Sequence, residues 1–104
     1  MVWEFRVRSG KRREFERAYG PDGVWAKLFR RGEGYISTDL IRDLKMPRRY
    51  LTLDVWTSRE AYARFQKGNR AEYLAIDQRC ASLTESEAKI GEFQSGANQK
   101  RWRP

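Results

Sequence analysis

The sequence predicts one α+β domain in which a four-stranded antiparallel sheet carries two interrupted helices. Three observations lead to this prediction. The length of 104 residues suits a single domain. Stretches in which apolar and polar residues alternate occur near both ends and in the middle of the chain, as in half-buried strands. Two stretches with helical spacing separate these strands, and each of them contains an internal break.

The first third of the chain predicts a strand followed by a split helix. Large apolar residues alternate with charged residues over positions 3–7, which is typical of a half-buried strand. Helical spacing begins at Lys11, is interrupted by Gly20-Pro21-Asp22-Gly23, and resumes through Phe29. Glycines at positions 32 and 34 are expected to end this helical segment.

The middle of the chain predicts two strands. Residues 35–41 are rich in β-branched and aromatic residues, and residues 50–56 alternate again, with a loop over 43–49 between them. Large residues occur on both faces of the later strand, with one set at Leu51, Leu53 and Val55 and the other at Tyr50, Thr52, Asp54 and Trp56. Helices of the same chain can cover only one face, so this pattern predicts that a second copy covers the other and forms a homodimer.

The last third predicts a second split helix and a closing strand. Thr57 and Glu60 have the spacing of a capping box, which would start a helix there. Helical spacing then continues to Leu83, with an interruption at Gly68-Asn69. Residues 89–94 predict the final strand. The resulting order, strand, split helix, two strands, split helix and strand, is that of the ferredoxin-like fold.

The composition limits what the chain can do. The formal net charge is +8, but basic and acidic residues are interspersed, so the charge does not favour nucleic-acid binding. The chain has one cysteine, Cys80, and no histidine, which argues against an internal disulfide and the usual zinc sites. No apolar run reaches the length of a membrane span, and no secretory signal is recognisable, so we expect a cytoplasmic protein. The predicted domain covers residues 1–94, and the basic residues 95–104 are expected to form a flexible tail.

Several segments share a family pattern, namely residues 4–7, 10–11, 15–23, 34–35, 50–56 and 58–62. Together they resemble the antibiotic-biosynthesis monooxygenase domain. The resemblance covers about residues 2–94, and its most specific part is the strand that ends in Trp56 and leads directly into a helix. It implies a dimeric α+β barrel, in which two four-stranded sheets pack face to face and each subunit has a pocket between sheet and helices.

The family contains two kinds of known oxygenase. The haem-degrading members rely on an asparagine on the first strand, a tryptophan at the end of the third strand and a histidine on the last helix. Only the tryptophan is matched here, by Trp56, and the chain has no histidine, so haem degradation is not expected. The other members oxidise aromatic polyketide phenols to quinones without a cofactor. The chain resembles them in having Trp56 and Tyr62 six residues apart, while Thr52 stands where they carry an asparagine.

Cofactor-free oxygenation requires an electron-rich substrate, a base and an apolar cavity. The resemblance therefore implies a monooxygenase for a small phenolic compound that uses no cofactor and no metal. The implied catalytic residues are Trp56, Tyr62 and Thr52. The expected substrate contacts are Asp54 as a further candidate base, Arg79 or Arg70 for developing negative charge, and Trp25 and Phe65 in the pocket. Trp56 could instead only pack under the capped helix, and Tyr62 could be one of the apolar residues of that helix together with Phe65. The alternative hypothesis for the protein is a small-molecule-binding dimer without catalytic activity.

Overall fold

A computed structural model describes residues 1–94 of the chain. The predicted tail at 95–104 lies outside the described residues. The elements follow the predicted order: β1 (Val2–Val7), α1 (Arg12–Tyr19), α2 (Val24–Phe29), β2 (Tyr35–Arg42), β3 (Arg49–Trp56), α3 (Arg59–Gly68), α4 (Arg70–Cys80), the 3-10 turn η1 (Ala81–Leu83) and β4 (Thr84–Gly91). No helix in this part of the chain is long and apolar enough to cross a membrane.

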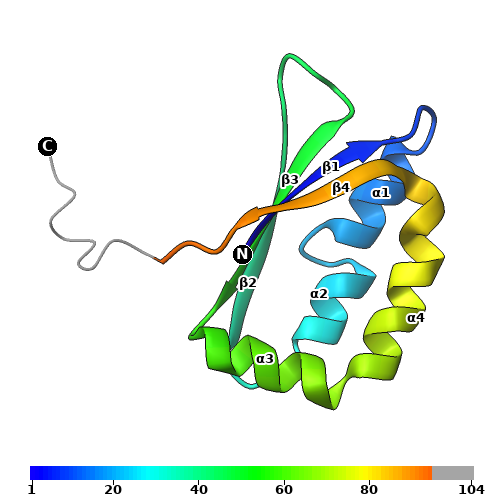
Figure 1. The fold of residues 1–104 in the computed structure, drawn as a ribbon. Helices are drawn as coiled ribbons and strands as arrows, with labels where there is room; N and C mark the ends of the chain where they lie inside the picture. Colours follow the sequence, from blue (N-terminus) through cyan, green and yellow to red (C-terminus); the bar gives the residue numbers. More distant parts are fainter. Residues whose placement is uncertain (95–104) are drawn as a thin grey trace, which may run out of the picture.

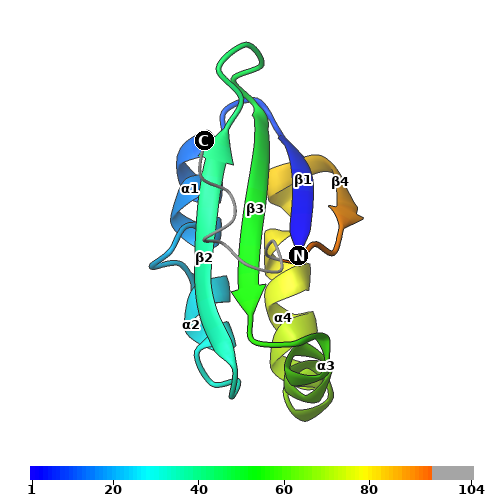
Figure 2. The same ribbon diagram turned by 90° about the vertical axis from the view of Figure 1, so that its left-hand side faces the viewer.

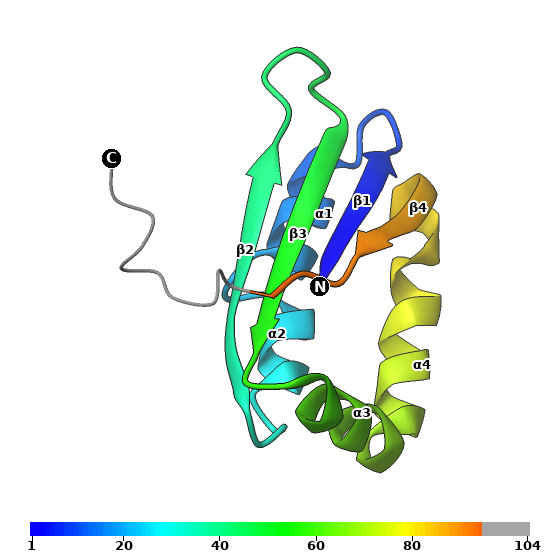
Figure 3. The ribbon, with the colours of Figure 1, turned by 60° about the vertical axis from the view of Figure 1, so that its left-hand side comes forward.

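The four strands form one antiparallel sheet with the order β2-β3-β1-β4. Helices α1, α2 and α4 cover one face of this sheet (Figure 1), and the opposite face is free of helices when the molecule is turned (Figure 2). Helix α3 follows β3 directly and lies across one end of the sheet (Figure 3). This arrangement confirms the predicted α+β, ferredoxin-like fold with split helices.

A close backbone approach explains why the first helix is split. A Cβ atom at Gly23 would lie only 2.2 Å from the carbonyl oxygen of Ala18, so the turn between α1 and α2 requires glycine at this position. Gly23 is also the N-cap of α2. Helix α2 can therefore leave in a new direction and bring Trp25 and Phe29, both buried, over the sheet.

The two faces of β3 differ as the alternation predicts. Tyr50, Thr52 and Asp54 are buried beneath the helices. On the other face, Val55 is 39% exposed, and Ile41 of β2, which pairs with Leu51, is 49% exposed. The helix-free face of the sheet therefore carries apolar side chains in contact with solvent in the single chain.

Two sequence predictions are wrong in detail. Ser58, not Thr57, caps α3, because the Ser58 Oγ accepts a hydrogen bond from the Ala61 N–H at 3.0 Å. The Thr57 N–H still pairs with the Gly34 carbonyl at 2.7 Å, which keeps Thr57 outside the helix and excludes the predicted capping box.

The second error concerns the last strand, which runs over Thr84–Gly91 and not over 89–94. Helix α4 ends at Cys80, and the turn η1 carries Leu83 into the core before the strand begins. Most of β4 is exposed, so its sequence lacks an apolar alternation. Backbone pairing with β1, from Val7 opposite Thr84 to Val2 opposite Gly91, specifies this strand.

Candidate functional site

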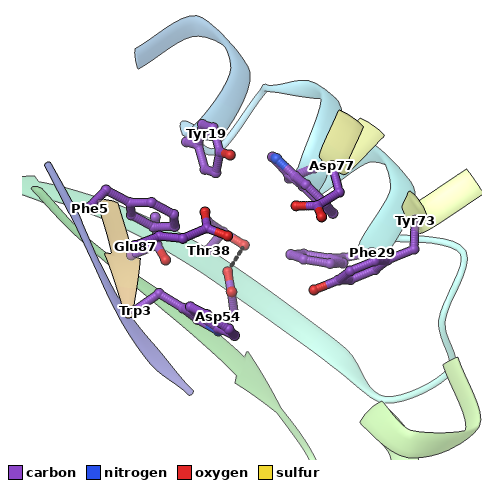
Figure 4. Close-up of a pocket in the computed structure, with 11 residues that line it drawn as sticks. Trp3, Phe5, Tyr19, Phe29, Thr38, Asp54, Tyr73, Asp77 and Glu87 are labelled. Atoms are coloured by element: carbon purple, nitrogen blue, oxygen red, sulfur yellow. Dashed lines mark hydrogen bonds between the residues drawn. The ribbon is translucent and has the colours of Figure 1, made fainter. Parts of the chain in front are cut away.

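A cavity of about 50 Å³ lies between the covered face of the sheet and helices α2 and α4. Its wall combines aromatic rings with a few polar side chains, which is the usual make-up of a small-molecule site. Figure 4 shows these side chains converging on one hollow from strands and helices. The lining residues are Trp3, Phe5, Tyr19, Trp25, Phe29, Thr38, Thr52, Asp54, Tyr73, Asp77 and Glu87.

Asp54 is the most buried carboxyl group of the wall, with 8% of its surface exposed. The alternation of β3 directs it toward the helices, and the sheet register places Thr38 of β2 directly opposite. The Thr38 hydroxyl donates a hydrogen bond to Asp54 Oδ1 at 2.8 Å and accepts one from the Tyr35 hydroxyl at 2.9 Å. This chain of hydrogen bonds fixes one carboxyl oxygen, and no hydrogen bond within residues 1–94 involves the other.

Burial raises the pKa of Asp54 above the ordinary value of an aspartate. The Thr38 hydrogen bond and the charge of the N-terminal ammonium group act in the opposite direction, but the effect of burial is larger. A raised pKa makes the carboxylate a stronger base than a solvated aspartate. Asp54 is therefore suited to take a proton from a bound ligand.

Two further carboxyl groups line the cavity, Asp77 of α4 and Glu87 of β4. Burial raises the pKa of Glu87, and the neighbouring charge of Asp77 raises it further. Within residues 1–94, no group of three or more histidine, cysteine or carboxylate side chains is close enough together to hold a metal ion.

The aromatic part of the wall comes mainly from β1, α2 and α4. The rings of Trp25 and Tyr73 meet edge to face at 4.9 Å between centroids, and Trp25 contacts Phe29 at 5.9 Å. Burial raises the pKa of Tyr19 well above that of a free phenol and also raises the pKa of Tyr73, so both side chains are neutral near neutral pH. The rings therefore provide an uncharged surface on which a planar ligand can pack.

The family model for antibiotic biosynthesis monooxygenases matches residues 1–102, almost the whole chain. The chain belongs to the antibiotic biosynthesis monooxygenase family. This result confirms the resemblance found in the sequence. No protein of curated function matches the chain significantly.

Solved structures share the fold of the chain. SnoaB, a cofactor-independent oxygenase from Streptomyces nogalater, is 22% identical, with 93% of this chain and 94% of SnoaB covered and a TM-score of 0.69. A putative antibiotic biosynthesis monooxygenase from Nitrosomonas europaea is 18% identical over 91% of this chain and 90% of its own, with a TM-score of 0.64. At these identities the likeness shows a shared fold.

In this member of the family, the predicted pair Trp56 and Tyr62 lies beside the cavity and not on its wall. Their rings meet at 5.3 Å between centroids, and Phe65 packs against Trp56 at 5.1 Å. Phe29 connects this cluster to the cavity, because it lines the wall and also contacts Trp56 at 5.9 Å. The structure thus brings the pair together, and its catalytic role stays a prediction.

The remaining predicted residues lie in three places. Thr52, Asp54 and Trp25 line the cavity. Arg79 lines a different, open hollow of about 510 Å³ between α1, α2 and α4. Arg70 is exposed at the start of α4 and lines neither hollow.

Sequence reasoning missed Asp77 and Glu87 as residues of the site. Asp77 follows Tyr73 by four residues on a helix, so the two side chains share a face, and this spacing could have indicated its position. Glu87 pairs with Phe5 across the β1–β4 ladder. The sequence pattern does not indicate this position, because it begins the last strand at residue 89, after Glu87.

Proposed function

We propose that the protein is a cofactor-independent monooxygenase that oxidises a small phenolic compound in the cavity between the sheet and the helices. Membership of the antibiotic biosynthesis monooxygenase family supports oxygenase chemistry. The observation that carries the proposal is Asp54, a buried carboxyl group with a raised pKa on the wall of an aromatic cavity. Such a group can deprotonate a phenol while the rings of the wall hold it.

The proposed reaction begins with proton transfer. The phenol hydroxyl gives its proton to the carboxylate of Asp54, whose other oxygen is held by Thr38. The phenolate then transfers an electron to molecular oxygen, and the two radicals combine at a ring carbon that carries a hydrogen. The protonated Asp54 returns its proton to the peroxide anion formed in this way, and loss of water from the resulting hydroperoxide leaves a quinone. One oxygen atom enters the product as the new carbonyl group and the other leaves as water with two hydrogens of the substrate, so the substrate supplies all four electrons.

The other residues are assigned supporting roles. Thr52 offers a hydroxyl group to the ligand from β3, next to Asp54, and Trp25 provides a ring surface. Trp56 and Tyr62 hold Phe29 in place and act as positioning residues. No arginine or lysine of residues 1–94 lines the cavity, so we assign no basic side chain to the reduction of oxygen.

Oxygen uptake by the metal-free protein with anthrone- or naphthol-type phenols tests this proposal. Asp54→Asn keeps an acceptor for the Thr38 hydroxyl but removes the base, so we expect uptake to fall about 10²- to 10⁴-fold. The matched control is Asp22→Asn, which removes a carboxyl group that is 98% exposed on the turn between α1 and α2. The proposal fails if no phenol supports uptake, or if Asp54→Asn and Asp22→Asn behave alike.

Substitution of the aromatic pair separates catalysis from positioning. If Trp56 and Tyr62 act through Phe29, then Trp56→Phe and Tyr62→Phe change the KM for the phenol more than kcat, because the rings shape the cavity. A loss of kcat comparable to that of Asp54→Asn would instead assign them the direct catalytic role that the family resemblance implies. Binding of phenols without any uptake would favour the alternative function, a small-molecule-binding protein.

We also propose that a second copy of the chain packs on the helix-free face of the sheet. Exposed or half-exposed apolar side chains on this face, Leu51, Leu53 and Val55 of β3 with Ile41 of β2, support this homodimer. Sedimentation velocity tests it with Leu53→Glu, which puts a charge at the middle of the face. A wild-type dimer that becomes a folded monomer in the variant supports the proposal, and a wild-type monomer at micromolar concentration contradicts it.

A further inference from the structure

The cavity wall is acidic in a strongly basic protein. Asp54, Asp77 and Glu87 line it, and no lysine or arginine of residues 1–94 does, although the formal net charge of the chain is +8. The three carboxyl groups come from β3, α4 and β4 and point into the same hollow (Figure 4). None of the three forms an ion pair with a basic side chain in the described part of the chain.

Two carboxyl groups outside the cavity, one of them on the same strand as Glu87, are arranged differently. Glu85 lies two residues before Glu87 on β4 and pairs with Arg48 at 2.8 Å. Asp43 pairs with Arg49 at 3.0 Å. Glu85 and Asp43 thus have basic partners, whereas Glu87 lies near Asp77, which is a destabilising arrangement of like charges. A positively charged ligand group between the two would relieve this repulsion.

The neighbouring rings favour the same kind of ligand. Trp3, Trp25 and Tyr73 line the cavity together with the carboxyl groups. Aromatic faces attract cations, and carboxylates form charge-assisted hydrogen bonds with protonated amines. The combination of rings and carboxylates is suited to an aromatic compound that carries a basic nitrogen.

We infer that the substrate of this site is a phenol bearing a protonated amine, held by Asp77 and Glu87 while its hydroxyl group reaches Asp54. This inference rests on the proposed function for the role of Asp54, but the recognition of the amine does not depend on turnover. Phenols that carry a carboxylate are excluded, because the wall offers them three negative groups and no positive one.

Anaerobic binding of three compounds with the same ring tests the inference by quenching of tryptophan fluorescence: naphthol, an aminomethyl naphthol and a hydroxynaphthoate. We expect the aminomethyl compound to bind about tenfold or more tightly than naphthol, as is typical for hydrogen bonds to charged groups, and the hydroxynaphthoate to bind most weakly. The net charge of the protein would produce the reverse order, so the expected order would reflect the acidic and aromatic wall of the cavity.

The double variant Asp77→Asn with Glu87→Gln identifies the groups responsible. We expect it to reduce the preference for the amine to less than about threefold while naphthol binding stays the same, because the rings are unchanged. Glu33→Gln is the control, since it removes an exposed carboxyl group away from the cavity, and a cooperative urea transition shows that each variant is folded. Equal binding of the three compounds, tighter binding of the carboxylate, or a preference that survives in the double variant overturns the inference.

The outcomes separate this inference from the proposed function. Amine-selective binding without oxygen uptake by any phenol would contradict the oxygenase and retain the ligand class. Oxygen uptake with naphthol and no preference for the amine would support the oxygenase and contradict the proposed ligand class.

Discussion

The space between sheet and helices has two unlike ends, and β3 supplies a residue to each of them. At one end, Trp56 is surrounded by rings, with Phe65, Tyr62 and Phe29 between 5.1 and 5.9 Å from it. At the other end, Asp54 lines a hollow that is bounded by two more carboxyl groups. The closed end consists mainly of packed aromatic rings, among which the Trp56 Nε1–H has no hydrogen-bond partner within residues 1–94. The carboxyl groups of the hollow end form no ion pair in that part of the chain and border empty volume.

This difference separates the residues that stabilise the fold from the residues that are suited to ligand binding or catalysis. Tight aromatic packing lowers the free energy of the folded state, whereas buried carboxyl groups and a cavity raise it. Groups that are costly to the fold are typical of functional sites, because ligand binding or catalysis needs them. The residues that resemble the family pattern, Trp56 and Tyr62, lie at the stabilising end, and Phe29 connects them to the hollow.

The largest loss of stability is expected from truncating an aromatic side chain at the closed end. Phe65 is 3% exposed and contacts Trp56, Phe29 and Tyr62, so Phe65→Ala should lower the free energy of unfolding by about 3–5 kcal/mol. Tyr73→Ala at the hollow end should cost about 1 kcal/mol, because Tyr73 is only partly buried and already borders empty space. Urea unfolding with equal m-values measures both, and equal losses would contradict the distinction between the two ends.

A smaller loss of stability is expected from replacing Gly32, the glycine that makes room for the Trp56 ring. A Cβ atom at Gly32 would lie 2.7 Å from two carbons of this ring and 3.0 Å from Phe65. Gly32→Ala should therefore cost about 1–3 kcal/mol through overpacking. Gly68→Ala is the matched control, since a Cβ atom at this last residue of α3 meets nothing within 4 Å. It should leave stability unchanged or raise it by up to about 1 kcal/mol.

If Gly32→Ala proves as harmless as Gly68→Ala in urea unfolding, the Trp56 cluster has room to shift. The closed end would then be less tightly packed than its geometry indicates.

The fold could be predicted from the sequence because most elements bury one side. Alternation in β1 and β3 and helical spacing in α1 and α2 follow directly from what each face contacts. The exception is β4, whose side chains are mostly exposed and which is specified by its backbone pairing with β1. A strand of this kind leaves little pattern in the sequence, so the pattern predicts its start five residues too late.

The candidate site could be predicted only in part. The alternation of β3 puts Thr52 and Asp54 on the same face as Trp56, and all three are near the cavity or its supporting cluster. The predicted substrate contacts Arg79 and Arg70 lie outside the cavity. Which way each face of α4 points depends on its packing against α2 and the sheet, and local sequence does not contain that information.

The smallest expected effect is on the pH dependence of stability. Asp54 and Asp43 provide a comparison, because their pKa values are shifted in opposite directions. Asp54 has a raised pKa, so its ionisation favours the unfolded chain, and stability is lost as the pH rises above the ordinary value of 3.8. Asp54→Asn removes this loss. The difference in unfolding free energy, variant minus wild type, should increase between about pH 3 and about pH 7. The change is modest because the Thr38 hydrogen bond offsets part of the cost of burial.

Asp43, in the loop between β2 and β3, should behave in the opposite way. Its pKa is lowered by hydrogen bonds from the N–H groups of Lys45 and Met46 and by Arg49. Its ionised form therefore stabilises the fold above the ordinary pKa, and this contribution is lost as the pH falls. In urea titrations, Asp43→Asn should thus become relatively less stable as the pH rises, while Asp54→Asn becomes relatively more stable. Two profiles with the same slope would mean that Asp54 is solvated, and its assignment as the base of the site would then lose its physical basis.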